Sequence, residues 1–98
     1  MGKNLRIKFI TDGLRKLVYQ FKGEGIQIRY EFQKLTNVHL VEVLPFDLFE
    51  KNTDYILAET KLQDEFESRF GSETDEEIIF ISDNSLNEIK EDEGEMIK

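Results

Sequence analysis

Residues 26–45 read IQIRYEFQKLTNVHLVEVLP and contain the clearest structural pattern in the chain. From 26 to 33, apolar and polar residues alternate with the period of two that is typical of a half-buried strand. Residues 34–37 form a turn. Val38–Leu44 is a second strand, and it ends at Pro45, which has no N–H to donate to a sheet ladder. The apolar members of the first strand are Ile26, Ile28, Tyr30 and Phe32.

The preceding segment supports two interpretations. Leu5, Ile7 and Phe9 alternate with basic residues, and Asp12-Gly13 follows as a strong hairpin signal. We therefore expect two further strands, one around 5–9 and one around 16–22, with a second turn at Gly23-Glu24-Gly25. The alternative is a helix, because Leu14, Leu17, Val18 and Phe21 also fit helical spacing.

Residues 46–70 change to helical character. Asn52 or Thr53 is a suitable N-cap for a long helix, and Gly71 lies where a C-cap glycine is expected. Ile78–Ile81 is a continuous apolar strand of the kind that lies inside a sheet or against a helix. Ser85 and Glu88 have capping-box spacing, which predicts a short helix over 86–89. One face of the long helix carries Tyr55, Glu59, Leu62, Phe66 and Phe70.

These elements predict an α+β fold with two layers. We expect a mostly antiparallel sheet of about five strands in the order β-β-β-β-α-β, with one long helix packed on one face. The fifth strand can lie antiparallel to the first or parallel to the fourth. Residues 1–89 would form a single domain, and 90–98 a disordered acidic tail.

Charge is unevenly distributed along the chain. Residues 1–45 hold eight Lys/Arg and four Asp/Glu, residues 46–70 hold three and seven, and residues 71–98 hold two and ten. The last segment therefore has a net charge of −8, equal to that of the whole protein. A basic first half and an acidic end can neutralise each other or bind different partners.

Several function classes find no support in the composition. The chain has no cysteine and one histidine, His39, so a zinc site or a Ser-His-Asp set is not expected. We predict no catalytic residues, no cofactor and no metal. No apolar run is long enough to cross a membrane. An acidic end repels phosphate, so nucleic acid is not an expected partner.

The hypothesis about a binding site concerns a basic sheet face. In the predicted sheet, five cations project from three neighbouring strands, and this face could dock an acidic partner or the chain's own tail. Its simpler interpretation is an ordinary solvated face. The tail could instead capture a basic partner. The candidate partner-binding residues are Arg6, Lys8, Lys16, Lys22 and Arg29 on the face, and Glu91, Asp92 and Glu93 in the tail.

No motif assigns a biological role. The first expectation is a small, acidic, cytoplasmic, non-enzymatic domain for protein–protein interaction, comparable in class to toxin-neutralising or immunity proteins. Edge strands would be available for pairing with the partner. The alternative is a small-ligand-binding protein or enzyme subunit whose site forms at the interface of a homo-oligomer. The chain would accordingly be a monomer or a homodimer paired through strand edges.

Overall fold

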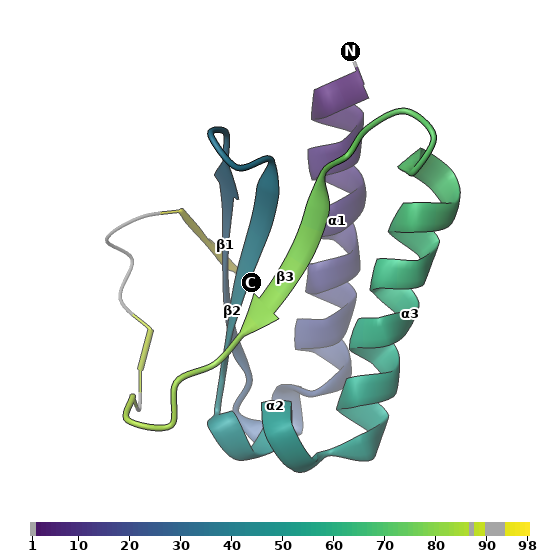
Figure 1. Cartoon of the computed structure of the whole chain (residues 1–98). Helices are drawn as coiled ribbons and strands as arrows, with labels where there is room; N and C mark the ends of the chain where they lie inside the picture. Colours follow the sequence, from purple (N-terminus) through teal and green to yellow (C-terminus); the bar gives the residue numbers. More distant parts are fainter. Residues whose placement is uncertain (1, 87, 90–93) are drawn as a thin grey trace.

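The computed structural model describes residues 2–86, 88–89 and 94–98, with side chains from Asn4 onward (Figure 1). It is an α+β fold with a four-stranded mixed sheet. The elements in chain order are α1 (Gly2–Gln20), η1 (Lys22–Glu24), β1 (Gln27–Gln33), β2 (Val38–Leu44), α2 (Phe46–Lys51), α3 (Thr53–Phe70), β3 (Glu77–Ile81) and β4 (Glu95–Ile97).

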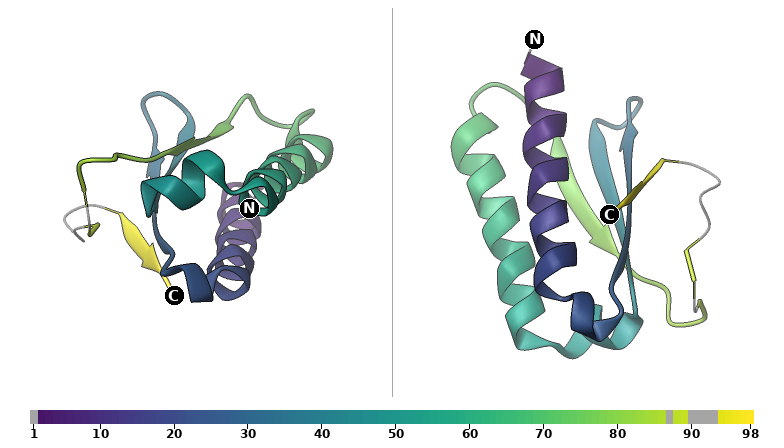
Figure 2. Two further views of the ribbon diagram at one scale, coloured as in Figure 1. Left: turned by 90° about the horizontal axis from the view of Figure 1, so that it is seen from below. Right: turned by 180° about the vertical axis from the view of Figure 1, so that it is seen from behind.

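The sheet has the strand order β3-β2-β1-β4. β1 and β2 form an antiparallel hairpin in which Tyr30 lies opposite Val41, and β4 pairs antiparallel with the other edge of β1. β3 runs parallel to β2, with Ile79 opposite Leu40. Both long helices, α1 and α3, lie on the same side of the sheet, so the other side is left without a helix (Figure 2).

The predicted strands within residues 5–22 are wrong, because residues 2–20 form the single helix α1. Its core-facing residues recur at alternating steps of four and three, which is the spacing of one helical face. The apparent alternation over 5–9 covers too few residues to distinguish the two periods. The buried residues of this face are Ile10, Leu14, Leu17 and, just past the helix, Phe21.

Gly13 serves helix packing and not a hairpin turn. A Cβ atom at this position would lie 2.5 Å from Cδ1 of Leu62 on α3, so glycine leaves room for the Leu62 side chain between the two helices. Its neighbour Asp12 is on the helix surface, where it accepts hydrogen bonds from Lys8 (2.7 Å) and Arg15 (3.1 Å). The Asp-Gly pair therefore has a helical explanation that depends on a contact about fifty residues away.

The prediction of a long helix that ends before Gly71 is confirmed by α3. Asn52 is its N-cap, and its side-chain Oδ1 accepts a hydrogen bond of 3.0 Å from the Tyr55 N–H. Four residues of the expected face are buried, and Glu59 is partly buried beside them. The buried four are Tyr55, Leu62, Phe66 and Phe70.

The sheet has four strands where about five were predicted, and the order of the elements differs. Loss of the two N-terminal strands accounts for most of the change. β3 takes the second of the two expected positions, parallel to the preceding strand, with α2 and α3 in the connection. No short helix forms over the described residues of 86–89.

The C-terminal end also differs from the expected disordered tail where it is described. Residues 90–93 lie outside the described part of the chain, but Glu95–Ile97 form β4. Ile97 lies opposite Ile28 and is buried in the core, and Glu95 lies 3.7 Å from Arg15. The sequence therefore supplies a strand that covers one edge of the sheet.

Candidate functional site

The five cations predicted to form one basic sheet face lie on three different kinds of element. Arg6, Lys8 and Lys16 are on α1, Lys22 is in η1, and Arg29 is on β1. Because α1 packs on one side of the sheet and Arg29 points to the other, the structure does not gather them on one face. The acidic residues Glu91, Asp92 and Glu93 lie outside the described residues.

Most of these cations already have a local partner. Arg29 donates to Glu42 (3.2 Å) and Glu31 (3.0 Å) on the outer side of the sheet. The Lys22 ammonium lies 4.4 Å from the Tyr19 ring centre. Arg29 is mostly buried between its two carboxylates, whereas Lys22 is exposed.

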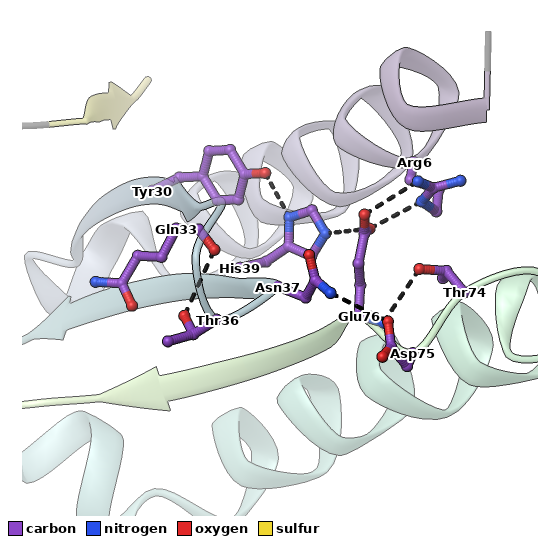
Figure 3. A network of polar contacts seen from close by, with 9 residues as sticks. All are labelled: Arg6, Tyr30, Gln33, Thr36, Asn37, His39, Thr74, Asp75 and Glu76. Carbon is purple, nitrogen blue, oxygen red and sulfur yellow. Dashed lines mark hydrogen bonds and ion pairs between the residues drawn. The ribbon is translucent and has the colours of Figure 1, made fainter.

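Arg6 instead belongs to a buried polar network that joins α1 to the sheet (Figure 3). Its Nε and Nη2 donate to the two carboxylate oxygens of Glu76 at 2.8 and 3.0 Å. Glu76 Oε1 also lies 2.8 Å from Nε2 of His39, and His39 Nδ1 lies 2.6 Å from the Tyr30 hydroxyl. The network thus links α1, β1, β2 and the residue just before β3.

The electrostatics of this network favour a neutral imidazole. Burial lowers the pKa of His39, although the Glu76 carboxylate acts in the opposite direction. The Arg6 hydrogen bond holds the pKa of Glu76 below its usual value. A neutral His39 that carries its proton on Nε2 can donate a hydrogen bond to Glu76 and accept one from the Tyr30 hydroxyl at Nδ1, so both ring nitrogens are paired.

The network has the residue types of an acid–base site but is closed to substrate. His39 is 0% exposed, and Tyr30 is also buried. A general acid or base must reach the proton that it transfers, directly or through one water. The arrangement instead fixes the position at which β3 begins.

The burial of Glu76 was not predicted from the sequence. This residue lies within the acidic run Glu73–Glu77, and nothing in the residue types distinguishes it from its neighbours. Its one signal is its spacing of two residues from Ile78, because alternation places both side chains on the inner side of the sheet. A buried carboxylate of this kind needs a cation, and that cation is 70 residues away at Arg6.

The free edge of β3 is the second feature of interest. The Glu77 N–H donates to the Asn37 carbonyl, so the backbone groups of Glu77, Ile79 and Ile81 face β2. Alternation then directs those of Ile78 and Phe80 away from the sheet. The Gln63 side chain of α3 donates to the Ile78 carbonyl at 3.2 Å, which confirms this direction. No other described strand pairs along this edge.

The outer side of the sheet beside this edge is apolar. Ile79 and Ile81 are 38% and 39% exposed, and they alternate with the inward-facing Ile78 and Phe80. The neighbouring strand β2 adds Leu40, which lies opposite Ile79. A strand edge bordered by apolar side chains is unusual in a monomer, because natural sheets usually protect edges with charges, proline or bulges.

A groove of about 280 Å³ lies between β3 and the second half of α3. Phe66 and Ile78 supply its apolar surface. Its lining is completed by Gln63, Asp64, Glu67, Glu76 and Glu77. Arg6 balances Glu76, but the structure shows no ion pair within the described residues for Asp64, Glu67 or Glu77. The groove is therefore negatively charged and continuous with the free edge of β3.

A larger groove of about 420 Å³ follows the seam between α1 and α3. Its lining mixes carboxylates with cations, so it selects neither sign of charge. Arg69 lies 5.5 Å from the Phe9 ring centre and 5.4 Å from that of Phe70, which occupies its guanidinium. The charged residues of this groove are Asp12, Lys16, Lys61, Glu65 and Arg69.

A buried carboxyl on α3 lies away from both grooves. Oε2 of Glu59 and the hydroxyl of Tyr55 are buried without a hydrogen-bond partner within the described residues. Burial raises the pKa of Glu59 to about 7, and the nearby Tyr55 hydroxyl counteracts this only in part. Glu59 therefore takes up a proton near neutral pH while remaining inside the fold.

We expect Glu59→Gln to stabilise the protein by about 1–2 kcal/mol at pH 8, because each unit of pKa shift corresponds to about 1.4 kcal/mol and partial exposure reduces the full value. The folded state keeps the Glu59 proton up to a pH of about 7, whereas the unfolded chain loses it near 4.5. The contribution of the Glu59 carboxyl to wild-type stability thus falls as pH rises from 4.5 to about 7, and the stabilisation by Glu59→Gln should vanish below pH 4.5. Urea denaturation from pH 4 to 8 measures the difference. The exposed Glu65→Gln serves as the control, and equal pH profiles for the two variants would contradict the expectation.

The described residues show neither a metal-binding cluster nor a membrane-spanning helix. No group of three or more His, Cys, Asp or Glu side chains in this part of the chain is placed to hold a metal ion. None of the helices found there is long and apolar enough to cross a bilayer. Comparison with protein families, with curated proteins and with solved structures gives no match to this chain.

Proposed function

We propose that this chain is a small non-enzymatic interaction domain that binds an extended segment of a partner protein as a strand added beside β3. The observation that carries the proposal is the free edge of β3, with apolar side chains on its outer side and a groove on its helix side. Neutralisation of the partner, as immunity-type proteins do, belongs to this proposal, and the cytoplasm is the compartment proposed for it.

The two edges of the sheet support this assignment by their contrast. β4 covers part of β1, so that edge is protected by the chain itself. The sequence of β3, Glu-Ile-Ile-Phe-Ile, has no proline and no lysine, and among the described residues the side chain that donates to its free edge is that of Gln63, at the Ile78 carbonyl. An added strand would satisfy the remaining backbone groups of Ile78 and Phe80 and cover Ile79 and Ile81.

Self-association through the same edge is the second candidate. An antiparallel pair of β3 strands centred on Ile79 would bring Asp75 of one copy opposite Asp83 of the other. Like charges in opposing positions destabilise a sheet, and two chains of net charge −8 repel at longer range. These repulsions favour a different protein as the partner, and the mass in solution, measured by analytical ultracentrifugation, distinguishes the two candidates.

Amide hydrogen exchange tests strand addition directly. In the free protein, the amides of Ile78 and Phe80 should exchange faster than those of Ile79 and Ile81, which face β2. The tightest binder from a library of random ten-residue peptides should slow exchange at Ile78 and Phe80. The β2-facing pair provides an internal control, since its protection exists before binding.

A matched pair of variants locates the contact. Ile79→Ser should weaken the selected peptide at least tenfold, whereas Leu57→Ser, which alters an exposed leucine on α3, should leave binding unchanged. A selected peptide that slows no β3 amide, or that binds Ile79→Ser as tightly as wild type, would overturn strand addition. A library without any binder in the millimolar range would overturn it as well.

A further inference from the structure

We propose that the segment received at the β3 edge is cationic, with lysine or arginine alternating with apolar residues, and that its cationic side chains enter the groove between α3 and β3. This inference rests on the proposed strand addition and names the chemistry of the partner. It assigns the groove between α3 and β3, and not the C-terminal residues, as the acidic surface that selects a basic protein.

The alternation follows from the two sides of the edge. Side chains of an added strand point in turn to the outer side of the sheet and to the helix side. On the outer side they meet Ile79 and Ile81, which favours apolar residues there. On the helix side they meet the groove, whose lining includes four carboxylates and no lysine or arginine.

The groove suits a long cationic side chain in shape as well as in charge. Phe66 and Ile78 offer an apolar surface to the methylene groups of lysine or arginine, while the carboxylates of Asp64 and Glu67 on α3 can receive the charged end. The groove also runs along the second half of α3, and the carboxyl end of a helix carries partial negative charge. Binding at this position therefore places a cation where several negative groups act on it together.

Strand addition requires the Gln63 side chain to move. Its amide occupies the position at the Ile78 carbonyl that a backbone N–H of the added strand would take. Exchange of one hydrogen bond for another at the same carbonyl changes the free energy little. The length of the segment follows from β3, whose five residues span about 17 Å and therefore match a segment of five to seven residues.

Three synthetic seven-residue peptides test the inference against wild-type protein. They alternate valine with arginine, with serine or with glutamate, and their dissociation constants are measured by fluorescence anisotropy at 50 and 300 mM NaCl. The arginine peptide should bind at least tenfold tighter than the glutamate peptide at low salt, with the serine peptide between them. The preference should narrow at high salt, because screening weakens exposed charge pairs.

Local and overall charge are separated by two double variants with the same change in net charge. Asp64→Asn with Glu67→Gln should weaken the arginine peptide at least fivefold. Glu24→Gln with Glu50→Gln, both exposed and outside the groove lining, should change it less than twofold. Equal losses in the two double variants would overturn the assignment to the groove.

The remaining outcomes distinguish this inference from the proposed function. Equal binding of the arginine and glutamate peptides, with slowed exchange at Ile78 and Phe80, overturns the cationic preference and leaves strand addition intact. Binding of the arginine peptide without slowed exchange at these amides overturns both, because the peptide is then held elsewhere by charge alone. Failure of all three peptides to bind in the millimolar range also overturns the inference.

Discussion

Glu76→Ala is expected to lower the free energy of unfolding by about 3–5 kcal/mol, the range found when one partner of a buried ion pair is removed. The reason is that one carboxylate serves two groups, since it accepts both hydrogen bonds from Arg6 and lies 2.8 Å from Nε2 of His39. Without Glu76, the partly buried Arg6 and the fully buried His39 each lose a partner that no other described side chain replaces.

Urea denaturation at pH 7 measures this loss. The matched control is Glu77→Ala, which removes the adjacent exposed carboxylate and should change stability by no more than about 0.5 kcal/mol. A loss below about 1 kcal/mol for Glu76→Ala would mean that the network contributes little to the fold. Acid should reduce the difference in the free energy of unfolding between wild type and Glu76→Ala. Because the folded pKa of Glu76 lies below its ordinary value of 4.5, its contribution is present above that pH and disappears as pH falls through the folded pKa.

The local sequence pattern was sufficient to predict the secondary structure in the middle of the chain but not at its start. The hairpin of β1 and β2 and the helix α3 are each long and regular, and their bounds agree closely with the sequence interpretation. In α1, however, the five residues 5–9 happen to alternate, and Asp12-Gly13 resembles a turn. The helical spacing of Leu14, Leu17 and Phe21 competed with these signals, and the role of Gly13 beside Leu62 depends on a long-range contact that no local pattern contains.

The two ends of the sheet show the same limitation. Acidic composition around β4 predicts disorder, yet Ile97 is buried opposite Ile28, and the pairing with β1 is a long-range contact. The apolar run of β3 was expected inside the sheet or against a helix. It lies against α3 but at the edge, and this position is what makes it a candidate for binding.

The candidate site was therefore predictable only in its general character. An acidic surface and an edge strand were expected from the sequence, but the acidic residues were sought after residue 90, and the protein partner stays a prediction. The structure places Asp64 and Glu67 of α3 beside Glu77 of β3, although these residues are separated by an entire loop. Their common location depends on the parallel pairing of β2 with β3, which the sequence left open against an alternative.

Phe66→Ala is expected to destabilise the protein by about 3–5 kcal/mol, the usual cost of truncating a buried phenylalanine. Phe66 is 3% exposed and lies at the centre of an aromatic cluster that joins α3 to α1 and the sheet. Its ring centre is 5.3 Å from that of Phe70, 6.4 Å from that of Phe9 and 5.7 Å from that of His39. A cavity at this position would separate the two helices and loosen the imidazole that Glu76 holds.

Phe32→Ala provides the comparison, because the same atoms are removed from a partly buried site. The Phe32 ring centre lies 4.6 Å from that of His39, but Phe32 is beside the hairpin turn and only partly buried, so we expect a loss of about 1–2 kcal/mol. Urea denaturation of both variants gives the ranking. Equal losses of stability in Phe66→Ala and Phe32→Ala would contradict the structure, in which Phe66 is more deeply buried than Phe32. Phe66 also lines the groove between α3 and β3, so a folded Phe66→Leu variant should retain the apolar surface of the groove. We expect this variant to bind the arginine peptide within about threefold of wild type. The result would separate the contribution of the Phe66 ring to stability from that of the carboxylates to binding.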